Sequence, residues 1–236
     1  MNQLSKITYA YLETTNYCNL RCSFCNREEV IGPLKHMSLD NWGKLLDGIK
    51  HHPIEEAKLM GMGEPMLHPQ FDEVCRMFKE TFPNAKLIVA TNCQYNIKEG
   101  LEFRRKFQEC LKYIDVLYFS IDGWGESYER DRAPAKWSKL LKFLEDFKTI
   151  NRYDCDCTVN YVVNAYNVDD IEKVDKLRTD NKLGMLRLNI AQIWDEETKM
   201  SDDLATSGYT MEQLNYLRDN WSDNIMGKSK WDFEDC

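Results

Sequence analysis

The chain has 236 residues and a formal net charge of -8, with 31 Lys and Arg against 39 Asp and Glu. A chain of this length buries one hydrophobic core more readily than two, so we expect one main domain. The acidic balance disfavours nucleic acid as a partner, because non-specific phosphate attraction needs a basic surface. The sequence contains neither a run approaching roughly 18 apolar residues nor an apolar N-terminal signal segment, so we expect a cytoplasmic protein with no membrane partner.

Strand-like runs rich in Val, Ile, Tyr and Phe alternate with helical patterns, which is typical of βαβ units with a parallel sheet. The expected strands cover residues 7–15, 57–62, 86–92, 116–122, 157–164 and 186–193. The expected helices are one capped by Ser38 and others over residues 69–82, 99–113, 137–147, 169–177 and 210–221. Six such units predict an α/β fold, a partial (β/α)6 TIM-like barrel with parallel strands and functional loops at their C-terminal ends.

The loop after the first expected strand carries Cys18, Cys22 and Cys25 in the spacing C-x-x-x-C-x-x-C. Cysteine thiolates are the usual ligands of cubane clusters, and three of them would leave one of four irons open to a cofactor or substrate. Zinc is the main competing metal, but a structural zinc site takes four ligands and the nearest histidine is His36. A chance grouping of three cysteines in one loop is the other alternative.

These residues resemble the radical S-adenosylmethionine (SAM) superfamily, whose members carry C-x-x-x-C-x-φ-C after the first strand. The aromatic position φ is matched by Phe24, and further motifs follow in order at the ends of successive strands up to about residue 195. The resemblance implies that the three cysteines hold a 4Fe-4S cluster. It also implies that SAM is the cofactor, cleaved to a 5′-deoxyadenosyl radical that takes a hydrogen atom from the substrate.

The segment Gly61-Met62-Gly63-Glu64-Pro65 is similar to the Gly-Gly-Glu-Pro segment with which the family engages the amino group of the cofactor's methionine moiety. Met62 stands where the family usually has Gly. Gly63 still permits close approach of the backbone, and Glu64 supplies an acceptor for an ammonium group. The alternative for Glu64 is a carboxylate that stabilises a helix N-terminus.

Several later residues match cofactor-binding positions of the family. Ser120 resembles the residue that binds the ribose, and Arg132 the one that pairs with the cofactor carboxylate, a role that suits a guanidinium fork. Ile190 lies where the family packs the adenine, while Asn160 could equally be a polar residue satisfied inside the barrel. The cofactor-binding positions implied by the resemblance are Gly61, Gly63, Glu64, Thr91, Asn92, Ser120, Arg132, Asn160 and Ile190.

The resemblance does not select a substrate, because function lives in sites grafted onto folds. The tail MGKSKWDFEDC resembles the point where SPASM-type peptide-modifying members begin a cysteine-rich domain, which favours a peptide or protein over a small molecule. We therefore expect the barrel over residues 1–200, followed over residues 201–236 by a C-terminal helix and tail, the remnant of such an extension. A reducing partner such as flavodoxin or ferredoxin would supply the electron.

Other functions stay open at this point. One is an iron–sulfur or zinc-binding regulatory or structural protein on the same barrel, without turnover, and reductive cleavage of SAM would discriminate it. Within enzymes, the alternatives are glycyl-radical activation and nucleobase or tRNA modification, of which the acidic charge disfavours the second.

The remaining cysteines have two expected roles. Cys75 and Cys110 fall beside apolar positions of predicted helices and should be small core residues. Cys155, Cys157 and Cys236 would form an incomplete set for an auxiliary cluster with four cysteine ligands.

Overall fold

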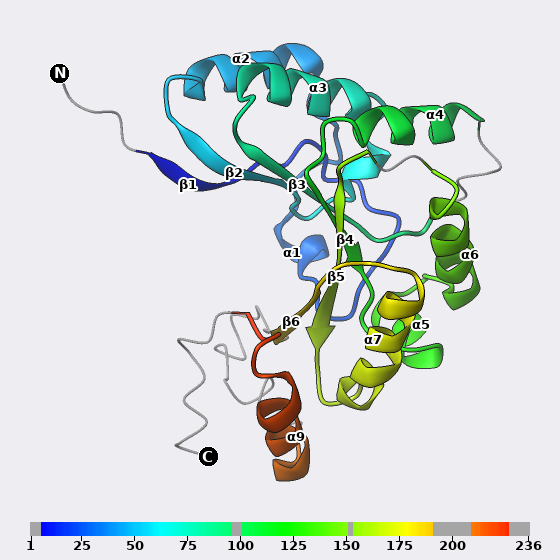
Figure 1. Cartoon of the computed structure of the whole chain (residues 1–236). Coiled ribbons are helices and arrows are strands. Elements are labelled where there is room, and N and C mark those ends of the chain that lie inside the picture. Colours follow the sequence, from blue (N-terminus) through cyan, green and yellow to red (C-terminus); the bar gives the residue numbers. More distant parts are fainter. Residues whose placement is uncertain (1–5, 96–100, 151–152, 191–208, 227–236) are drawn as a thin grey trace. The chain divides into compact units, whose positions relative to one another are not determined.

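The structure, a computed structural model, describes residues 6–95, 101–150, 153–190 and 209–226 (Figure 1). Its strands form one sheet in the order β1-β2-β3-β4-β5-β6. They are β1 (Ile7–Tyr11), β2 (Ile54–Leu59), β3 (Lys86–Thr91), β4 (Val116–Ser120), β5 (Asp156–Val163) and β6 (Leu186–Ile190). The sequential order and parallel pairing confirm the predicted α/β fold of a partial (β/α)6 barrel.

Helices follow the strands along the chain. They are α1 (Arg27–Val30), α2 (Leu39–Ile49), α3 (Phe71–Thr81), α4 (Leu101–Cys110), α5 (Glu126–Asp131), α6 (Trp137–Phe147), α7 (Ile171–Asp180) and α9 (Met211–Trp221). Short 3-10 helices η1 (Pro65–Leu67) and η2 (Val168–Asp170) precede α3 and α7. No helix within the described ranges combines the length and apolarity that crossing a membrane requires.

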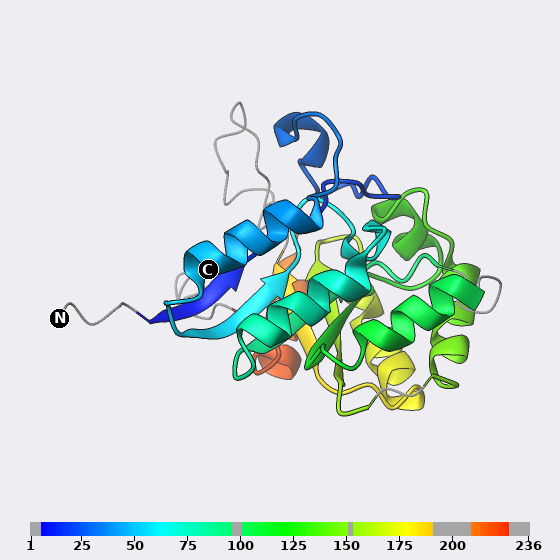
Figure 2. The ribbon, with the colours of Figure 1, turned by 90° about the horizontal axis from the view of Figure 1, so that it is seen from above.

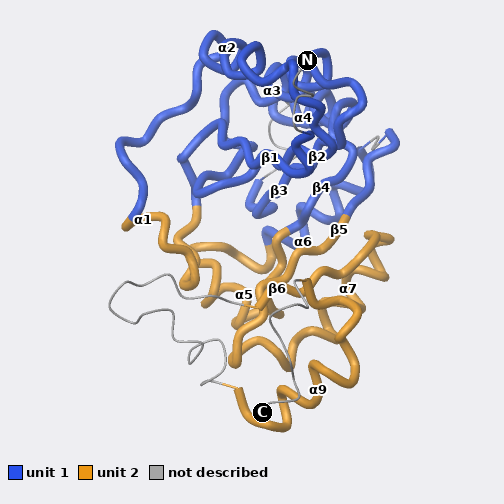
Figure 3. The backbone as a smooth tube through the Cα atoms, turned by 90° about the vertical axis from the view of Figure 1, so that its left-hand side faces the viewer, with its two compact units in different colours: residues 1–19, 30–119, 139–157 blue, residues 20–29, 120–138, 158–236 orange. Residues whose placement is uncertain are grey.

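The chain folds into two compact units that interleave along the sequence (Figure 3). The first unit comprises residues 1–19, 30–119 and 139–157, and the second comprises residues 20–29, 120–138 and 158–236. The predicted boundary near residue 200 lies outside the described residues, so the division into barrel and tail stays a prediction.

The first unit is a parallel sheet covered on one face by helices. β1 pairs with β2, β2 with β3 and β3 with β4, all in parallel. Seen from above, α2, α3 and α4 lie over the strands (Figure 2). Ala57 and Leu59 of β2 are fully buried, whereas the intervening Lys58 is half-buried, because successive side chains of a strand point to opposite faces.

Aromatic side chains fill the space between this sheet and its helices. The ring of Phe119 meets those of Phe143 and Phe147 edge-on, at centroid distances of 5.9 and 5.0 Å. The indole nitrogen of Trp42, fully buried on α2, donates to the Val74 carbonyl of α3 at 3.1 Å. Buried aromatics of this kind supply large apolar area, and they pack these helices against each other and against the strands.

The second unit contains the β5–β6 pair, whose register places Asn160 beside Arg187. Residues near Ile225 add a parallel bridge to Leu188 on β6. The preceding helix α9 begins with a capping box in which the Thr210 hydroxyl accepts from the Gln213 backbone N–H at 3.2 Å. The helix predicted over residues 210–221 is thereby confirmed with its start signal.

Several predicted boundaries differ from the structure. β1 ends at Tyr11 instead of continuing to Thr15, which turns aside to form an isolated bridge with His36. β2 begins at Ile54, three residues before the predicted start, because Glu55 and Glu56 lie in the strand and mask its apolar pattern. The last three residues of the predicted strand 186–193 lie outside the described residues.

Candidate cofactor site

The three cysteines predicted to bind a cluster are divided between the two units. Cys18 is half-buried in the first unit, while Cys22 and Cys25 belong to the second. A turn joins the latter two, since the Cys25 backbone N–H donates to the Cys22 carbonyl at 3.0 Å. Within the described part of the chain, no three His, Cys, Asp or Glu side chains gather at metal-binding distance. The donor set itself, three thiols in one short loop, has the chemistry that fits an iron–sulfur cluster.

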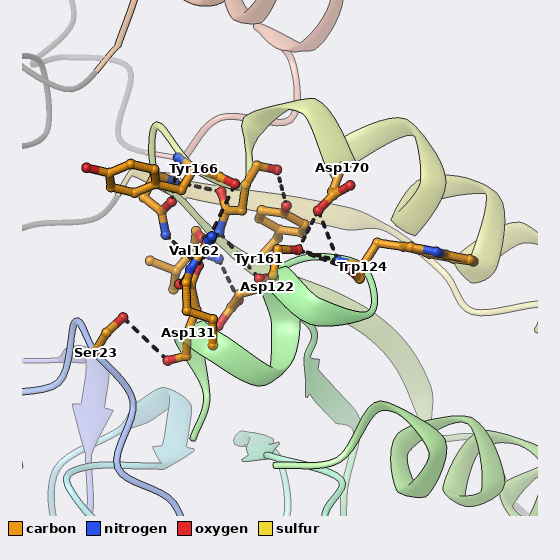
Figure 4. Close-up of polar contacts among 12 residues, drawn as sticks. Ser23, Asp122, Trp124, Asp131, Tyr161, Val162, Tyr166 and Asp170 are labelled. Atoms are coloured by element: carbon orange, nitrogen blue, oxygen red, sulfur yellow. Dashed lines mark hydrogen bonds and ion pairs between the residues drawn. The ribbon is translucent and has the colours of Figure 1, made fainter. Parts of the chain in front are cut away.

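In the second unit the cysteine loop is fixed to the segment that follows α5. The Arg21 N–H donates to the Ala133 carbonyl at 2.6 Å, and the Ser23 N–H donates to the Asp131 carbonyl at 2.9 Å. The Ser23 side chain points to the same carbonyl (Figure 4). These backbone bonds flank Cys22 on both sides, so they fix the loop at that cysteine.

Arg132 lies between these anchors and is 7% exposed. Its Nε donates to Oδ2 of Asp122, its terminal nitrogen lies 3.9 Å from the Cys22 sulfur, and its guanidinium lies 5.6 Å from the centre of the Phe24 ring. Burial opposes the charge on Arg132, but the charges of Asp122 and Cys22 outweigh it and raise the pKa. Arg132 therefore stays cationic beside a predicted cluster ligand.

Asp122, which follows β4, is fully buried and was not predicted as a site residue. Its Oδ1 accepts from the Val162 N–H at 2.7 Å (Figure 4), and its backbone carbonyl lies within 3.4 Å of the Asn167 amide. Burial raises the pKa of Asp122, while Arg132 and the Val162 N–H lower it. The ion pair with Arg132 offsets the cost of removing the Asp122 carboxylate from water.

The same buried network includes Asp131 (Figure 4). Its Oδ2 accepts from the Asn164 amide at 2.9 Å and from the Asn167 amide at 3.4 Å. The Tyr161 hydroxyl donates a hydrogen bond to the backbone carbonyl of Asn167 at 2.6 Å. The network therefore joins β5 and its following loop to the segment that holds the cysteine loop.

In the first unit Glu64 is 4% exposed and links two segments. Its Oε2 accepts from the Asn92 N–H at 2.7 Å, and its Oε1 accepts from the Met66 N–H at 3.2 Å at the start of η1. Burial raises the pKa of Glu64 to about 7, although these hydrogen bonds favour the charged form. Glu64 thus caps the N-terminus of η1, as the alternative interpretation of this residue predicts. It also hydrogen-bonds the backbone at the end of β3.

Both glycines of the motif lie against the segment after β1. A Cβ on Gly61 would overlap the Glu13 side chain, and one on Gly63 would overlap the Thr15 carbonyl oxygen. The Glu13 carboxylate accepts from the N–H groups of Met62 and Gly63, at 2.5 and 3.0 Å. Gly63, which meets backbone atoms, is the position that most needs glycine, and this close approach is retained despite the Met62 departure.

Asn92 fixes the same loop near Cys18. Its amide donates to the Asn19 side chain at 2.7 Å, and Asn19 donates to the Gln94 carbonyl at 3.3 Å. Thr91 is buried and accepts from the Cys93 N–H at 3.3 Å. Of the two predicted residues at the end of β3, Asn92 therefore contacts the start of the cysteine loop, while Thr91 bonds Cys93.

The other predicted site residues belong to the second unit. Ser120 is buried at the end of β4. Asn160 accepts from the Asn189 amide at 2.9 Å, and its carbonyl accepts from the Ile121 N–H at 3.1 Å, so the satisfied polar interpretation gains support. Ile190 is half-buried and ends β6. Residues 191 and 192, predicted to extend the adenine segment, lie outside the described residues.

The sequence interpretation missed Glu13, Asn19 and Asp122. Each had one local signal, since Asp122 closes the predicted strand 116–122, Glu13 lies near the end of the predicted strand 7–15, and Asn19 adjoins Cys18. Their partners lie more than 30 residues away or in another segment, which the sequence pattern does not reveal. Cys75 and Cys110 are buried as predicted, whereas Cys236 lies outside the described residues.

Comparisons with known proteins give a consistent result. A model of the Radical SAM superfamily matches residues 12–177. The tungsten-containing aldehyde ferredoxin oxidoreductase cofactor-modifying protein of Pyrococcus furiosus is 32% identical over 117 residues, which are 48% of this chain and 30% of that protein. The sporulation killing factor maturation protein SkfB of Bacillus subtilis is 24% identical over 165 residues, 69% of this chain and 37% of that protein.

Among solved structures, Streptococcus suis SuiB bound to S-adenosylmethionine matches with a TM-score of 0.68 at 18% identity. The match covers 95% of this chain and 50% of SuiB. At this identity the likeness establishes the fold alone. The chain spans about a third of the length of the curated relatives and half of SuiB.

Proposed function

Because the chain belongs to the radical SAM superfamily, whose enzymes use a 4Fe-4S cluster and SAM, we propose that it binds the cluster through Cys18, Cys22 and Cys25. When bound, cluster and cofactor supply a 5′-deoxyadenosyl radical for hydrogen abstraction. The family match over residues 12–177, with the cysteine triad inside it, is the observation that carries this proposal.

The chain's own residues would hold and orient these groups. The Glu13 carboxylate accepts a hydrogen bond from the Gly63 N–H and lies against Gly61. The backbone carbonyl groups of this segment would accept hydrogen bonds from the methionine ammonium. Glu64 positions that segment against β3 through its two backbone bonds. Ser120 and Asn160 would line the site of the SAM ribose, and Ile190 would pack against the adenine. Thr91 and Asn92 would lie beside the start of the cysteine loop.

Arg132 has the charge for the cofactor carboxylate, but Asp122 already engages its Nε. One terminal nitrogen lies 3.9 Å from the Cys22 sulfur, and the other would serve a carboxylate, since one guanidinium can donate to several acceptors. Its binding role is therefore compatible with the ion pair.

A peptide or protein is the substrate class that we favour. SkfB is named as a maturation protein of the sporulation killing factor, and SuiB has been solved with its precursor peptide SuiA. The match to SkfB covers 69% of this chain and the match to SuiB covers 95%, and the active sites of such barrels lie at the C-terminal ends of the strands. A reduced flavodoxin or ferredoxin would supply the electron, and the cytoplasmic location stays a prediction.

The test is anaerobic reconstitution of the wild-type chain with iron and sulfide, followed by dithionite and SAM. We expect 5′-deoxyadenosine from the wild type and none above background from Cys22→Ala. Cys110→Ala, which removes a buried thiol outside the triad, is the matched control and should retain turnover. Equal product from wild type and Cys22→Ala would exclude the proposal, and a cluster without any cleavage would favour a regulatory protein.

A further inference from the structure

The guanidinium of Arg132 contacts a predicted cluster ligand directly. Its terminal nitrogen lies 3.9 Å from the Cys22 sulfur, a hydrogen-bond contact for a sulfur acceptor, and its plane lies over Phe24, two residues along the same loop. The family resemblance assigns Arg132 to the cofactor carboxylate only. The structure therefore shows a contact that this role does not need.

We infer that Arg132 acts on the cluster as well as on the cofactor, by donating a charged hydrogen bond to the Cys22 sulfur and so raising the cluster's reduction potential. This inference rests on the proposed cluster at Cys22. Arg132 would exert its effect before any SAM is bound. It is a positioning and tuning residue for the cluster, and Asp122 is the residue that holds it in place.

The orientation of Arg132 is fixed by its partner. Asp122 is 0% exposed and uses one carboxylate oxygen for the Val162 N–H, which leaves the other for Nε of Arg132. While Nε donates to Asp122, a terminal nitrogen of the same guanidinium lies 3.9 Å from the Cys22 sulfur. The backbone bonds of Arg21 and Ser23 fix the cysteine on the other side of the contact.

The sign of the effect follows from charge. Reduction adds one electron to the cluster and makes or breaks no bond in the protein, so the reduced form carries one more negative charge. A nearby cation and a hydrogen bond to a ligand sulfur both stabilise that form, and such bonds are among the factors that set cluster potentials. Burial strengthens the interaction, because little water screens it.

The experiment is an anaerobic redox titration of the reconstituted cluster without SAM, followed by electron paramagnetic resonance. Relative to wild type, Arg132→Met should lower the midpoint potential, and Arg132→Lys, which keeps the charge but not the fork, should fall between them. Arg130→Met is the matched control, because Arg130 pairs with Asp131 and is half-exposed. Its midpoint potential should equal that of wild type.

The readouts separate this inference from the proposed function. A wild-type cluster that never cleaves SAM would contradict the proposed turnover, while a lowered potential in Arg132→Met would still support the inference. Iron content and circular dichroism identify variants that fail to assemble. If Arg132→Met holds no cluster, the midpoint potential of Arg132→Lys is compared with that of wild type instead. A potential equal to that of wild type, in whichever of these variants is used, would overturn the inference.

Discussion

Two carboxylates are buried near strand ends, Glu64 in the first unit and Asp122 in the second. They differ in the groups that compensate for the loss of water around the carboxylate. Glu64 accepts hydrogen bonds from two backbone N–H groups, and no cation pairs with it in the described part of the structure. Asp122 accepts one backbone N–H and pairs with Arg132. Neutral donors alone leave Glu64 with a pKa of about 7, whereas Asp122 has a full charge to offset its burial.

The comparison indicates different duties. The Glu64 carboxyl group titrates near neutrality and hydrogen-bonds two backbone segments. We therefore assign Glu64 the role of positioning those segments. Asp122 and Arg132 form an ion pair beside Cys22, so we assign them an electrostatic role at that cysteine. Variants of these residues test the distinction.

Asp122→Ala should lower the free energy of unfolding by about 3–5 kcal/mol, because removing one partner of a buried pair leaves the other charge uncompensated. Urea denaturation of the reduced, cluster-free protein measures this change. Removing both charges in Asp122→Ala/Arg132→Met should cost less than Asp122→Ala alone. A loss below about 1 kcal/mol for the single variant would mean that water already screens the pair.

Glu64 should make stability fall as the pH rises from about 4.5 to about 7. Its folded pKa lies above the ordinary value of 4.5, so the folded state binds the proton more tightly than the unfolded state across that window. The interval corresponds to about 3 kcal/mol, present below pH 4.5 and lost above pH 7. Urea titrations of wild type and Glu64→Gln should diverge by this amount, and parallel pH profiles would refute the assignment to Glu64.

The sequence predicted what depends on local pattern and missed what depends on distant pairing. The alternation of apolar runs located all six strands, and the family motifs pointed to Glu64 and Arg132, whose cofactor roles stay predictions. The Ser38 cap was readable because its partner lies three residues away, whereas the capping box at Thr210 was not singled out. Asp122 was not singled out, because its importance comes from Val162, 40 residues later, and from a guanidinium that the fold turns toward it.

Gly63→Ala should destabilise the first unit by about 1–3 kcal/mol, the usual cost of overpacking. The added methyl group would meet the backbone of Thr15 and Asn16, and backbone atoms cannot move aside as a flexible side chain can. Gly48→Ala is the matched control, because a Cβ there meets nothing within 4 Å and should stabilise α2 by about 0.5–1 kcal/mol. Thermal unfolding of both variants gives the comparison, and similar shifts for both would show that Gly63 is not tightly packed.

Arg130→Ala should change stability by no more than about 1 kcal/mol, although it removes an arginine–carboxylate pair one residue from the buried one. The Arg130 side chain is 50% exposed, so water screens its charge, although the side chain of its partner Asp131 is only 5% exposed. Asp131 keeps its hydrogen bonds from Asn164 and Asn167, which solvate its carboxylate after Arg130 is removed. Urea denaturation beside Asp122→Ala therefore tests the exposure of the arginine as the variable, and a loss as large as that of Asp122→Ala would show that charge pairing matters here regardless of that exposure.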